Sequence, residues 1–251
     1  MSELAIGGII LVCVYAGALV GMLLRHRLPD HHLTAESKDV VKVGAGLIGT
    51  MAVLLLGLLI ASAKASYDTK RGEITQMAAK VLFLDRILAN YGPEALEARE
   101  TLRHMLERAI VQIWPGDRSQ KAQFDPTANR GDQLFDVLEK LTPTTDRQRQ
   151  LKSQAEATAM EIGQMRWLLL VQRESTVSTP MLVTMVFWLA IVFLSFGLFA
   201  PPNTTVFVTL FLGALAVTGA IVLVLEFDQP FGGVIEITST AMRTALEHLG
   251  K

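Results

Sequence analysis

Residues 43–63 read VGAGLIGTMAVLLLGLLIASA, a run of 21 residues without a charged side chain. A helix needs about 20 apolar residues to cross the ~30 Å hydrocarbon core of a bilayer, because lipid offers its backbone no hydrogen-bonding partner. Three further uncharged runs of that length cover residues 4–24, 181–200 and 206–225. The four runs predict four transmembrane helices and an all-α integral membrane protein.

The composition agrees with a membrane protein that carries one large water-exposed part. Hydrophobic residues make up 51% of the chain and charged residues 19%, below the roughly 25% that is usual in soluble domains. Residues 64–180 hold 17 of the 23 Lys and Arg residues and 16 of the 24 Asp and Glu residues. The net charge of −1 leaves no basic surplus, so we expect no nucleic-acid partner. The single cysteine excludes an internal disulfide.

The charged insertion has the pattern of a helical domain. Its first apolar residues recur in alternating steps of three and four, and they are Ile74, Met77, Val81, Leu84, Leu88 and Tyr91. This spacing predicts a helix that continues the second span and ends at Gly92-Pro93. Further helices are expected over 94–113, 130–141 and 143–179, the last leading into the third span. The apolar seams are typical of a bundle core, and a subunit interface is the alternative.

The domain organisation follows from these boundaries. Residues 1–63 hold the first two spans with their connecting loop, 64–180 the helical domain, 181–225 the last two spans, and 226–251 a C-terminal segment. Four crossings put both termini and residues 64–180 on the same side, and Lys and Arg near the membrane are more numerous on that side, which favours the cytoplasm. The first run is expected to stay as an anchor, since no positive residue precedes it as in a signal peptide.

No motif in the chain predicts catalysis, so we expect neither an enzyme nor a cofactor. Asp30-His31-His32, with His26 nearby, could bind a divalent metal, but a polar loop beside the lipid headgroups is the interpretation we adopt. The carboxylates at Glu226 and Asp228 are similarly common at the end of a membrane helix. No Asp, Glu, Lys, Arg or His lies inside the four runs, which disfavours an ion-coupled transporter.

Small residues mark two of the predicted spans. Gly17 and Gly21 are four residues apart on the first span, and the second span carries a mostly small face made of Gly46, Thr50, Val53, Gly57, Ala61 and Lys64. Such residues let helices approach closely, so helix packing is one interpretation. The other is a pore wall, in which small and hydroxyl-bearing side chains leave room for water and bulky leucines form a narrow apolar ring.

Three pieces of sequence carry a resemblance to a known family. They are ESKDVVKVGAGLIGT at residues 36–50, LEARETL at residues 96–102 leading to Trp114-Pro115, and LEFDQPFG at residues 225–232. The chain resembles the bacterial bestrophin-like family, catalogued as a domain of unknown function, over nearly its whole length. The family typically shows Leu-Asp-Arg-Pro-Phe-x-Gly in the third piece. Asp228, Pro230 and Phe231 match it here, Gln229 stands in place of the arginine, and Gly232, which follows Phe231 at the variable position, is counted with the motif.

The resemblance implies a bestrophin-like fold and a membrane function. Bestrophins are four-span oligomeric ion channels, pentameric where best known, with a pore lined by the second span and a helical cytoplasmic part. By this likeness we expect a homo-oligomer in the bacterial inner membrane, a pentamer first and a tetramer second, that contacts lipid and passes small ions. The alternative is a non-conducting membrane scaffold whose helical domain self-assembles or recruits a partner.

If the protein is a channel, its second span is expected to line the pore. The candidate lining residues are Thr50, Leu55, Leu58, Leu59, Ser62, Lys64 and Ser66. Leu55, Leu58 and Leu59 would form a hydrophobic neck, because a narrow apolar ring excludes water and resists the passage of ions. Ser62 and Ser66 would line a wetter vestibule, and Lys64 would bias it toward anions.

Overall fold

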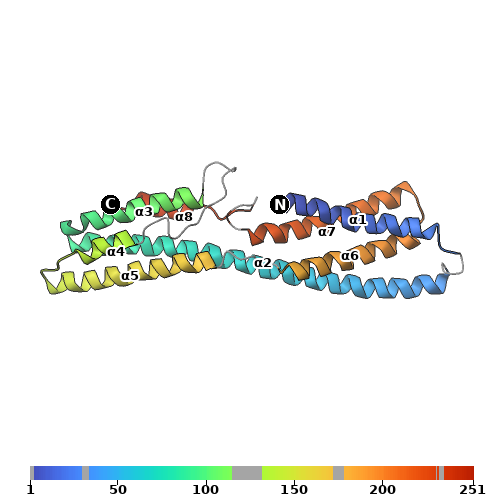
Figure 1. The fold of residues 1–251 in the computed structure, drawn as a ribbon, viewed down its shortest axis with the longest axis horizontal. Helices are drawn as coiled ribbons and strands as arrows, with labels where there is room; N and C mark the ends of the chain where they lie inside the picture. The colour runs from blue at the N-terminus through green and yellow to red at the C-terminus, as the bar shows by residue number, and fades with distance from the viewer. Residues whose placement is uncertain (1–2, 30–33, 115–131, 172–177, 230, 232–234) are drawn as a thin grey trace. The chain divides into compact units, whose positions relative to one another are not determined.

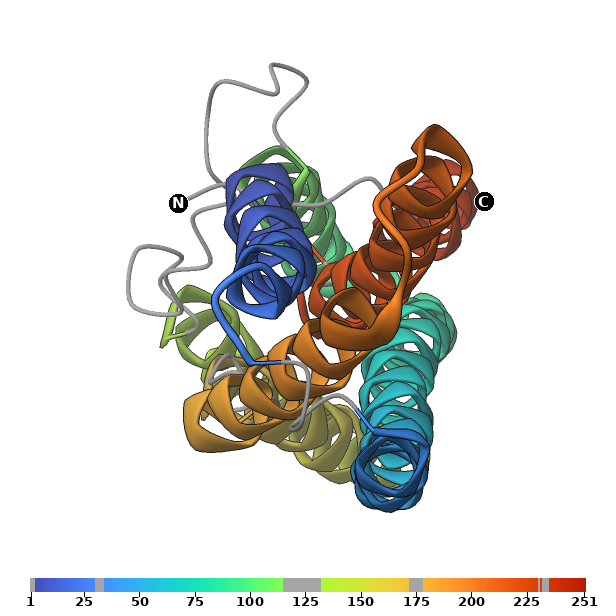
Figure 2. The ribbon, with the colours of Figure 1, turned by 90° about the vertical axis from the view of Figure 1, so that its right-hand side faces the viewer.

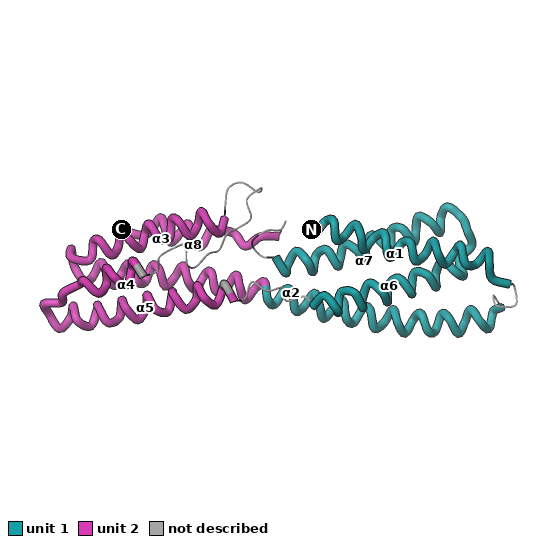
Figure 3. The backbone as a smooth tube through the Cα atoms, in the orientation of Figure 1, with its two compact units in different colours: residues 1–66, 175–229 teal, residues 67–174, 230–251 magenta. Residues whose placement is uncertain are grey.

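The computed structural model describes residues 3–29, 34–114, 132–171, 178–229, 231 and 235–251. Within this part of the chain every regular element is a helix, so the prediction of an all-helical protein is confirmed. The chain divides into two compact units (Figure 3). Unit 1 is Met1–Ser66 with Ser175–Gln229, and unit 2 is Tyr67–Glu174 with Pro230–Lys251.

Unit 1 contains the four apolar runs, each inside one helix (Figure 1). The helices are α1 (Glu3–Arg25), α2 (Ala35–Tyr91), α6 (Thr179–Phe199) and α7 (Thr204–Asp228). All four are long and apolar enough to cross a membrane. The turn between α6 and α7 holds two prolines, after which the side chain of Asn203 accepts a 2.8 Å hydrogen bond from the amide of Val206 and begins α7. Such a cap satisfies a backbone donor that has no partner within the helix.

Helices α1 and α6 are in backbone contact because glycines stand where they cross. A Cβ atom added to Gly17 would come within 2.7 Å of the Ala190 carbonyl oxygen, and one added to Gly21 would overlap the carbonyl oxygen of Leu194. Gly197 of α6 meets Ala18 in the same way. Both helices advance by four residues between the first two contacts, so they run parallel.

Helix α7 runs antiparallel to α1 and completes a layer of helices. Tyr15 and Phe211 stack edge to face with ring centroids 5.5 Å apart, while Gly7 lies against Val222. At the opposite end, the Arg25 guanidinium donates to the Ala200 carbonyl at the end of α6. Because α1 and α7 are antiparallel, the beginning of α1 and the end of α7 lie at one end of unit 1.

Figures 1 and 2 both show α6 between α1 and α2.

Unit 2 is a helical domain built on the second half of α2. It adds the single turn η2 (Pro93–Ala95) and the helices α3 (Leu96–Ile113), α4 (Asp132–Glu139) and α5 (Asp146–Val171). Gly92 ends α2 with a φ of 130°, a backbone conformation that only glycine adopts readily. The seam predicted from the sequence is buried, with Ile74, Leu84 and Leu88 at 2% exposure or less. The interpretation of this seam as a bundle core is therefore confirmed.

The C-terminal residues contain a helix that the sequence analysis did not predict. Helix α8 (Thr240–His248) packs beside α3 (Figure 1) and buries Met242 and Ala245. Ile237 and Leu249, on either side of it, are also buried. Of the C-terminal segment 226–251 expected from the sequence, residues 230–251 belong to unit 2, while residues 226–229 belong to unit 1.

Helix α2 is one uninterrupted helix of 57 residues, about 85 Å long at 1.5 Å per residue. This confirms the expectation that the second span continues as a helix into the charged region. The corresponding link from α5 into the third span was predicted over residues that lie outside the described part of the chain, since α5 ends at Val171 and α6 begins at Thr179.

A buried ion pair joins α2 to α3. Arg99 donates to both carboxylate oxygens of Asp85, at 2.7 and 3.0 Å, and the Asp85 side chain is only 7% exposed. The hydrogen bond from Arg99 to Asp85 raises the pKa of the guanidinium above its ordinary value. The backbone amide of Gly250 donates to the same carboxylate at 3.3 Å. One carboxylate thus links α2, α3 and the C-terminal residues.

We predict that Gly21→Val destabilises unit 1, because the new side chain must displace the α6 backbone. The expected cost is about 1–3 kcal/mol or more, measured as a lower thermal unfolding midpoint in detergent. Gly8→Val on the same helix is the control, since a Cβ at Gly8 meets no atom within 4 Å. Equal midpoints for the two variants would contradict the backbone contact.

We also predict that Asp85→Ala lowers the free energy of unfolding by about 3–5 kcal/mol, because it leaves the Arg99 side chain, which is only 17% exposed, without its carboxylate partner. Asp146→Ala is the control. It removes an ion pair to Arg149 whose side chains are 89% and 67% exposed, and such pairs contribute at most about 1 kcal/mol. Chemical denaturation of both variants measures the difference, and a loss below 1 kcal/mol for Asp85→Ala would show that the pair contributes little.

Candidate functional site

Helix α2 presents an open face in unit 1. Within their most apolar stretches, 17% of the residues of α2 are buried in the chain, against 33% for α1, 33% for α6 and 22% for α7. Cβ atoms added to Gly44, Gly46 or Gly57 would meet no atom within 4 Å. This face of α2 is therefore free to contact lipid, water or another copy of the chain.

The predicted pore-lining residues lie on two faces of α2. Thr50, Leu58 and Ser62 are exposed, while Leu59 is 5% exposed and belongs to the hydrophobic core of unit 1. Leu55 is partly buried against that core. The structure therefore does not bring Leu55, Leu58 and Leu59 together as one ring, because a difference of one residue turns the side chain by about 100° around a helix.

A second leucine shares the open face with Leu58. Leu54 is 70% exposed and Leu58 59%, and their spacing of four residues puts them one above the other. Thr50 precedes this pair by four residues and Ser62 follows it by four. Along the face, the two leucines therefore have one hydroxyl-bearing side chain on each side of them. Leu54 is not part of the ring predicted from the sequence, although its spacing of four residues from Leu58 is a sequence signal that could have identified it.

Lys64, which follows the apolar stretch of α2, lies beside α7. The Lys64 ammonium group is 5.9 Å from the centroid of the Phe227 ring, a cation–π geometry. Glu226 is buried at 5% exposure, while Asp228 and Ser66 are half-buried. Lys64 is thus held next to the family motif at the end of α7.

Two parts of the family resemblance meet in unit 2. The rings of Trp114 and Phe231 pack edge to face with centroids 6.3 Å apart, and the Trp114 indole nitrogen donates to the Ile237 carbonyl at 2.6 Å. Tyr67 donates to the neighbouring Glu236 carbonyl. The motif residues Pro230 and Gly232 lie outside the described residues. Phe231 and Trp114 together hold the chain that leads into α8.

The histidine-rich loop considered as a metal site cannot be placed. Asp30, His31 and His32 lie outside the described residues, and His26 is exposed. In the part of the chain that the structure describes, no group of three or more His, Cys, Asp or Glu side chains is arranged to hold a metal ion.

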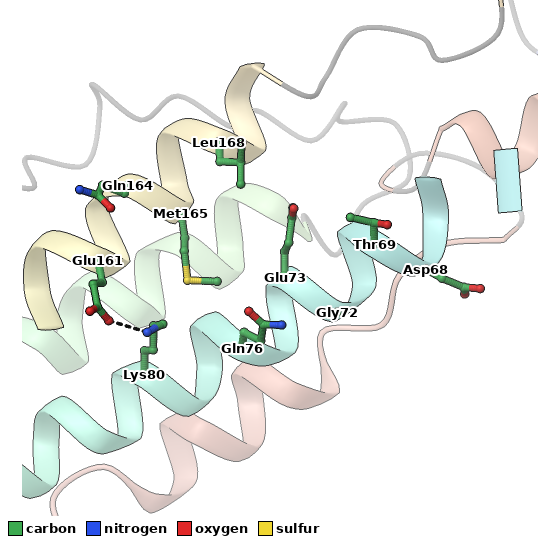
Figure 4. A pocket seen from close by; sticks show the side chains of 10 residues that line it. All are labelled: Asp68, Thr69, Gly72, Glu73, Gln76, Lys80, Glu161, Gln164, Met165 and Leu168. Atoms are coloured by element: carbon green, nitrogen blue, oxygen red, sulfur yellow. Dashed lines mark hydrogen bonds and ion pairs between the residues drawn. The ribbon is translucent and has the colours of Figure 1, made fainter. Parts of the chain in front are cut away.

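Unit 2 also has a wide groove between α2 and α5, with a volume of about 690 Å³. Figure 4 shows Glu161 and Lys80 meeting across it at 2.5 Å, with Met165 and Leu168 facing α2. Asp68 and Glu73 add acidic groups to its wall.

Comparison with known proteins identifies the family. The family model of the bestrophin-like domain matches residues 12–242. The chain belongs to the bestrophin-like family. It also resembles the crystal structure of a bacterial bestrophin homologue from Klebsiella pneumoniae that carries a point mutation, with a TM-score of 0.67 and 14% identity over 97% of this chain and 98% of that one. No curated protein matches the sequence.

The family assignment confirms the resemblance seen in the three sequence pieces. At 14% identity the likeness to the solved homologue shows a shared fold. Together with its four long apolar helices, membership shows that the chain is a bestrophin-like membrane protein.

Proposed function

We propose that the protein is a homo-oligomeric ion channel whose path is lined by the open face of α2. The observation that carries this proposal is the series Thr50, Leu54, Leu58 and Ser62, which is exposed in the single chain. Membership of a family related to bestrophin channels supports it.

The chemistry of this face suits a gated path. If copies of α2 surround a common axis, each turn of the helix contributes one ring of side chains. Leu54 and Leu58 then form two adjacent apolar rings, which exclude water when they are narrow. Thr50 and Ser62 place hydroxyl groups on either side, where ions can stay hydrated. This arrangement keeps Leu58 from the ring predicted from the sequence and replaces Leu55 and Leu59 by Leu54.

The assembly and its setting are part of the proposal. A pentamer is expected from the family likeness, with a tetramer second. Residues 1–63 and 181–225 cross the bacterial inner membrane four times in contact with lipid, while residues 64–180 and the segment 226–251 lie in the cytoplasm. Support comes from unit 1, where α1 runs parallel to α6 and antiparallel to α7, as four alternating crossings require.

The alternative function is a membrane scaffold, and a specific surface favours it. Met160, Trp167 and Val171 of α5 are 57%, 54% and 72% exposed, and their spacings of seven and four residues put them on one side of that helix. An apolar stripe of this kind is typical of a protein contact.

We predict that Leu58→Ser raises the conductance of the reconstituted protein, by about twofold or more, because every subunit adds a hydroxyl to the same apolar ring. Planar-bilayer recording measures the effect. Leu212→Ser on α7 is the control, since Leu212 is 57% exposed, nearly the same as Leu58, but lies outside α2.

Two results would contradict the channel. One is that neither the native protein nor Leu58→Ser conducts, which would favour the scaffold. The other is a purified protein that light scattering finds only as the 27.5 kDa chain, because the path needs several copies of α2.

We predict that unit 2 faces the cytoplasm. In a protein with Cys13→Ala, a single cysteine replaces either Glu100 in α3 or Thr205 at the beginning of α7, both exposed. A membrane-impermeant maleimide should label Thr205→Cys in intact cells and Glu100→Cys only after the cells are opened. The reverse labelling pattern would show the opposite orientation.

A further inference from the structure

Helices α2 and α5 lie side by side in unit 2 in a definite register. Glu161 of α5 forms an ion pair with Lys80 of α2. Seven residues after Glu161, Leu168 lines the same groove as Glu73, which is seven residues before Lys80 (Figure 4). The two helices are therefore antiparallel, and a residue that follows Lys80 in α2 lies level with the residue that precedes Glu161 in α5 by the same number.

Three exposed side chains of α5 form one edge of this pair of helices. Met160 and Trp167 are 57% and 54% exposed, and the side chain of Glu156 is 45% exposed. At about 100° per residue, all three point about 100–140° away from Glu161, on the side opposite to the buried Ile162. We call these three residues the α5 edge. It presents two bulky apolar groups and one carboxylate.

Three exposed residues of α2 form the other edge. Thr75, Ala79 and Arg86 are exposed, and they are turned by the same angle of about 100–140° away from Lys80, on the side opposite to the buried Ile74. We call these three residues the α2 edge. It presents two small groups and one guanidinium, the reverse of the α5 edge in both bulk and charge.

The charged groups of the two edges stand at nearly the same height. Arg86 is six residues after Lys80, and Glu156 is five residues before Glu161, so their heights differ by about 1.5 Å. The Lys152 ammonium group is 3.8 Å from Glu156 and donates to two backbone carbonyls, which leaves the carboxylate able to accept a further donor. Arg86 and Glu156 lie on opposite edges of the chain, so a contact between them requires two copies.

The uncharged groups of the two edges also correspond. By the same count, Thr75 lies about one residue from the level of Trp167, and Ala79 about two residues from the level of Met160, which is within about 3 Å. A small side chain on one edge therefore stands level with a bulky one on the other. Helices pack closely when large side chains of one fit beside small side chains of the next.

A closed ring of identical chains needs two different surfaces of this kind. Each copy presents one surface to the neighbour on one side and the other surface to the neighbour on the other side. In a ring whose axis runs along α2, neighbouring copies are related by rotation without a shift along the axis. Residues at equal heights on the two edges then meet, which is the correspondence that the α2 and α5 edges show.

We propose that the α2 edge of unit 2 binds the α5 edge of the next copy of the chain. Arg86 pairs with Glu156 of that copy, while Ala79 and Thr75 receive its Met160 and Trp167. This inference rests on the proposed homo-oligomer and names the surfaces by which unit 2 closes it. It also accounts for two large apolar side chains that a charged helical domain leaves exposed.

The first experiment joins the two edges covalently in the full-length protein with Cys13→Ala. Chains with Ala79→Cys are co-expressed with differently tagged chains with Met160→Cys, and the membranes are oxidised. The two kinds of chain should form disulfide-linked dimers, since only neighbouring edges bring the cysteines within reach. A chain with both substitutions should give a ladder of covalent oligomers that ends at the complete ring. Arg103→Cys, on the exposed side of α3, replaces Ala79→Cys in the control and should give no ladder.

The second experiment exchanges the charges on the background of the two cysteines. Arg86→Glu should lower the yield of the ladder by about fivefold or more, because it sets two carboxylates opposite each other. Glu156→Arg should lower it similarly, and the two exchanges together should restore it, which a misfolded variant would not do. Arg103→Glu on α3 is the matched control and should leave the yield unchanged.

Three outcomes would overturn the proposal. One is an oligomer, seen by light scattering, in which the doubly substituted chain gives no ladder, since another protein or lipid would then cover the two edges. Another is dimers from Ala79→Cys or Met160→Cys alone, which would show like edges meeting. The third is a double charge exchange that fails to restore the ladder. Ion conduction is tested separately, because a ladder can form in a protein that does not conduct, and a conducting protein can lack the ladder.

Discussion

The backbone contact between α1 and α6 is the constraint on which unit 1 depends. In lipid, helices are held together by van der Waals packing rather than by the hydrophobic effect, so small residues at a crossing decide which helices meet. Gly17, Gly21 and Gly197 let these two backbones touch. A Cβ atom added to any glycine of α2, by contrast, would come no closer than 3.9 Å to another helix of the described chain. Because the tight contacts join α1 to α6, α2 keeps an open face, and that face is the basis of the proposed path.

Helix α2 meets two different physical settings along one continuous backbone. Residues 43–63 of α2 are uncharged on every side, so the sequence of this stretch does not distinguish side chains that are buried in the chain from side chains that face lipid. Its second part is amphipathic, and there the apolar seam packs as in a water-soluble bundle. Unit 2 accordingly contains a bidentate ion pair between Asp85 and Arg99, in which the loss of either partner would leave a poorly solvated charge.

The sequence was sufficient for the features that depend on local pattern. The four uncharged runs, the stop at Gly92-Pro93 and the buried seam from Ile74 to Tyr91 could all be predicted from spacing and breakers. Three features could not. Helix α8 is short and gains its stability from contact with α3. The burial of Leu59 depends on where α6 and α7 lie. The Asp85–Arg99 pair joins α2 to α3, and the spacing of apolar residues in these helices does not determine which residues of the two helices lie side by side. In each case the deciding partner is distant in sequence.

The glycines of this chain show how one residue type serves two physical roles. Where an added Cβ would strike a neighbouring carbonyl, as at Gly21, the glycine permits helix contact. Where it would meet nothing on an exposed face, as at Gly57, the space lies outside the chain, which fits an oligomer or lipid. Helix stability favours alanine at the second position, so what occupies the adjoining space must explain why glycine stands there.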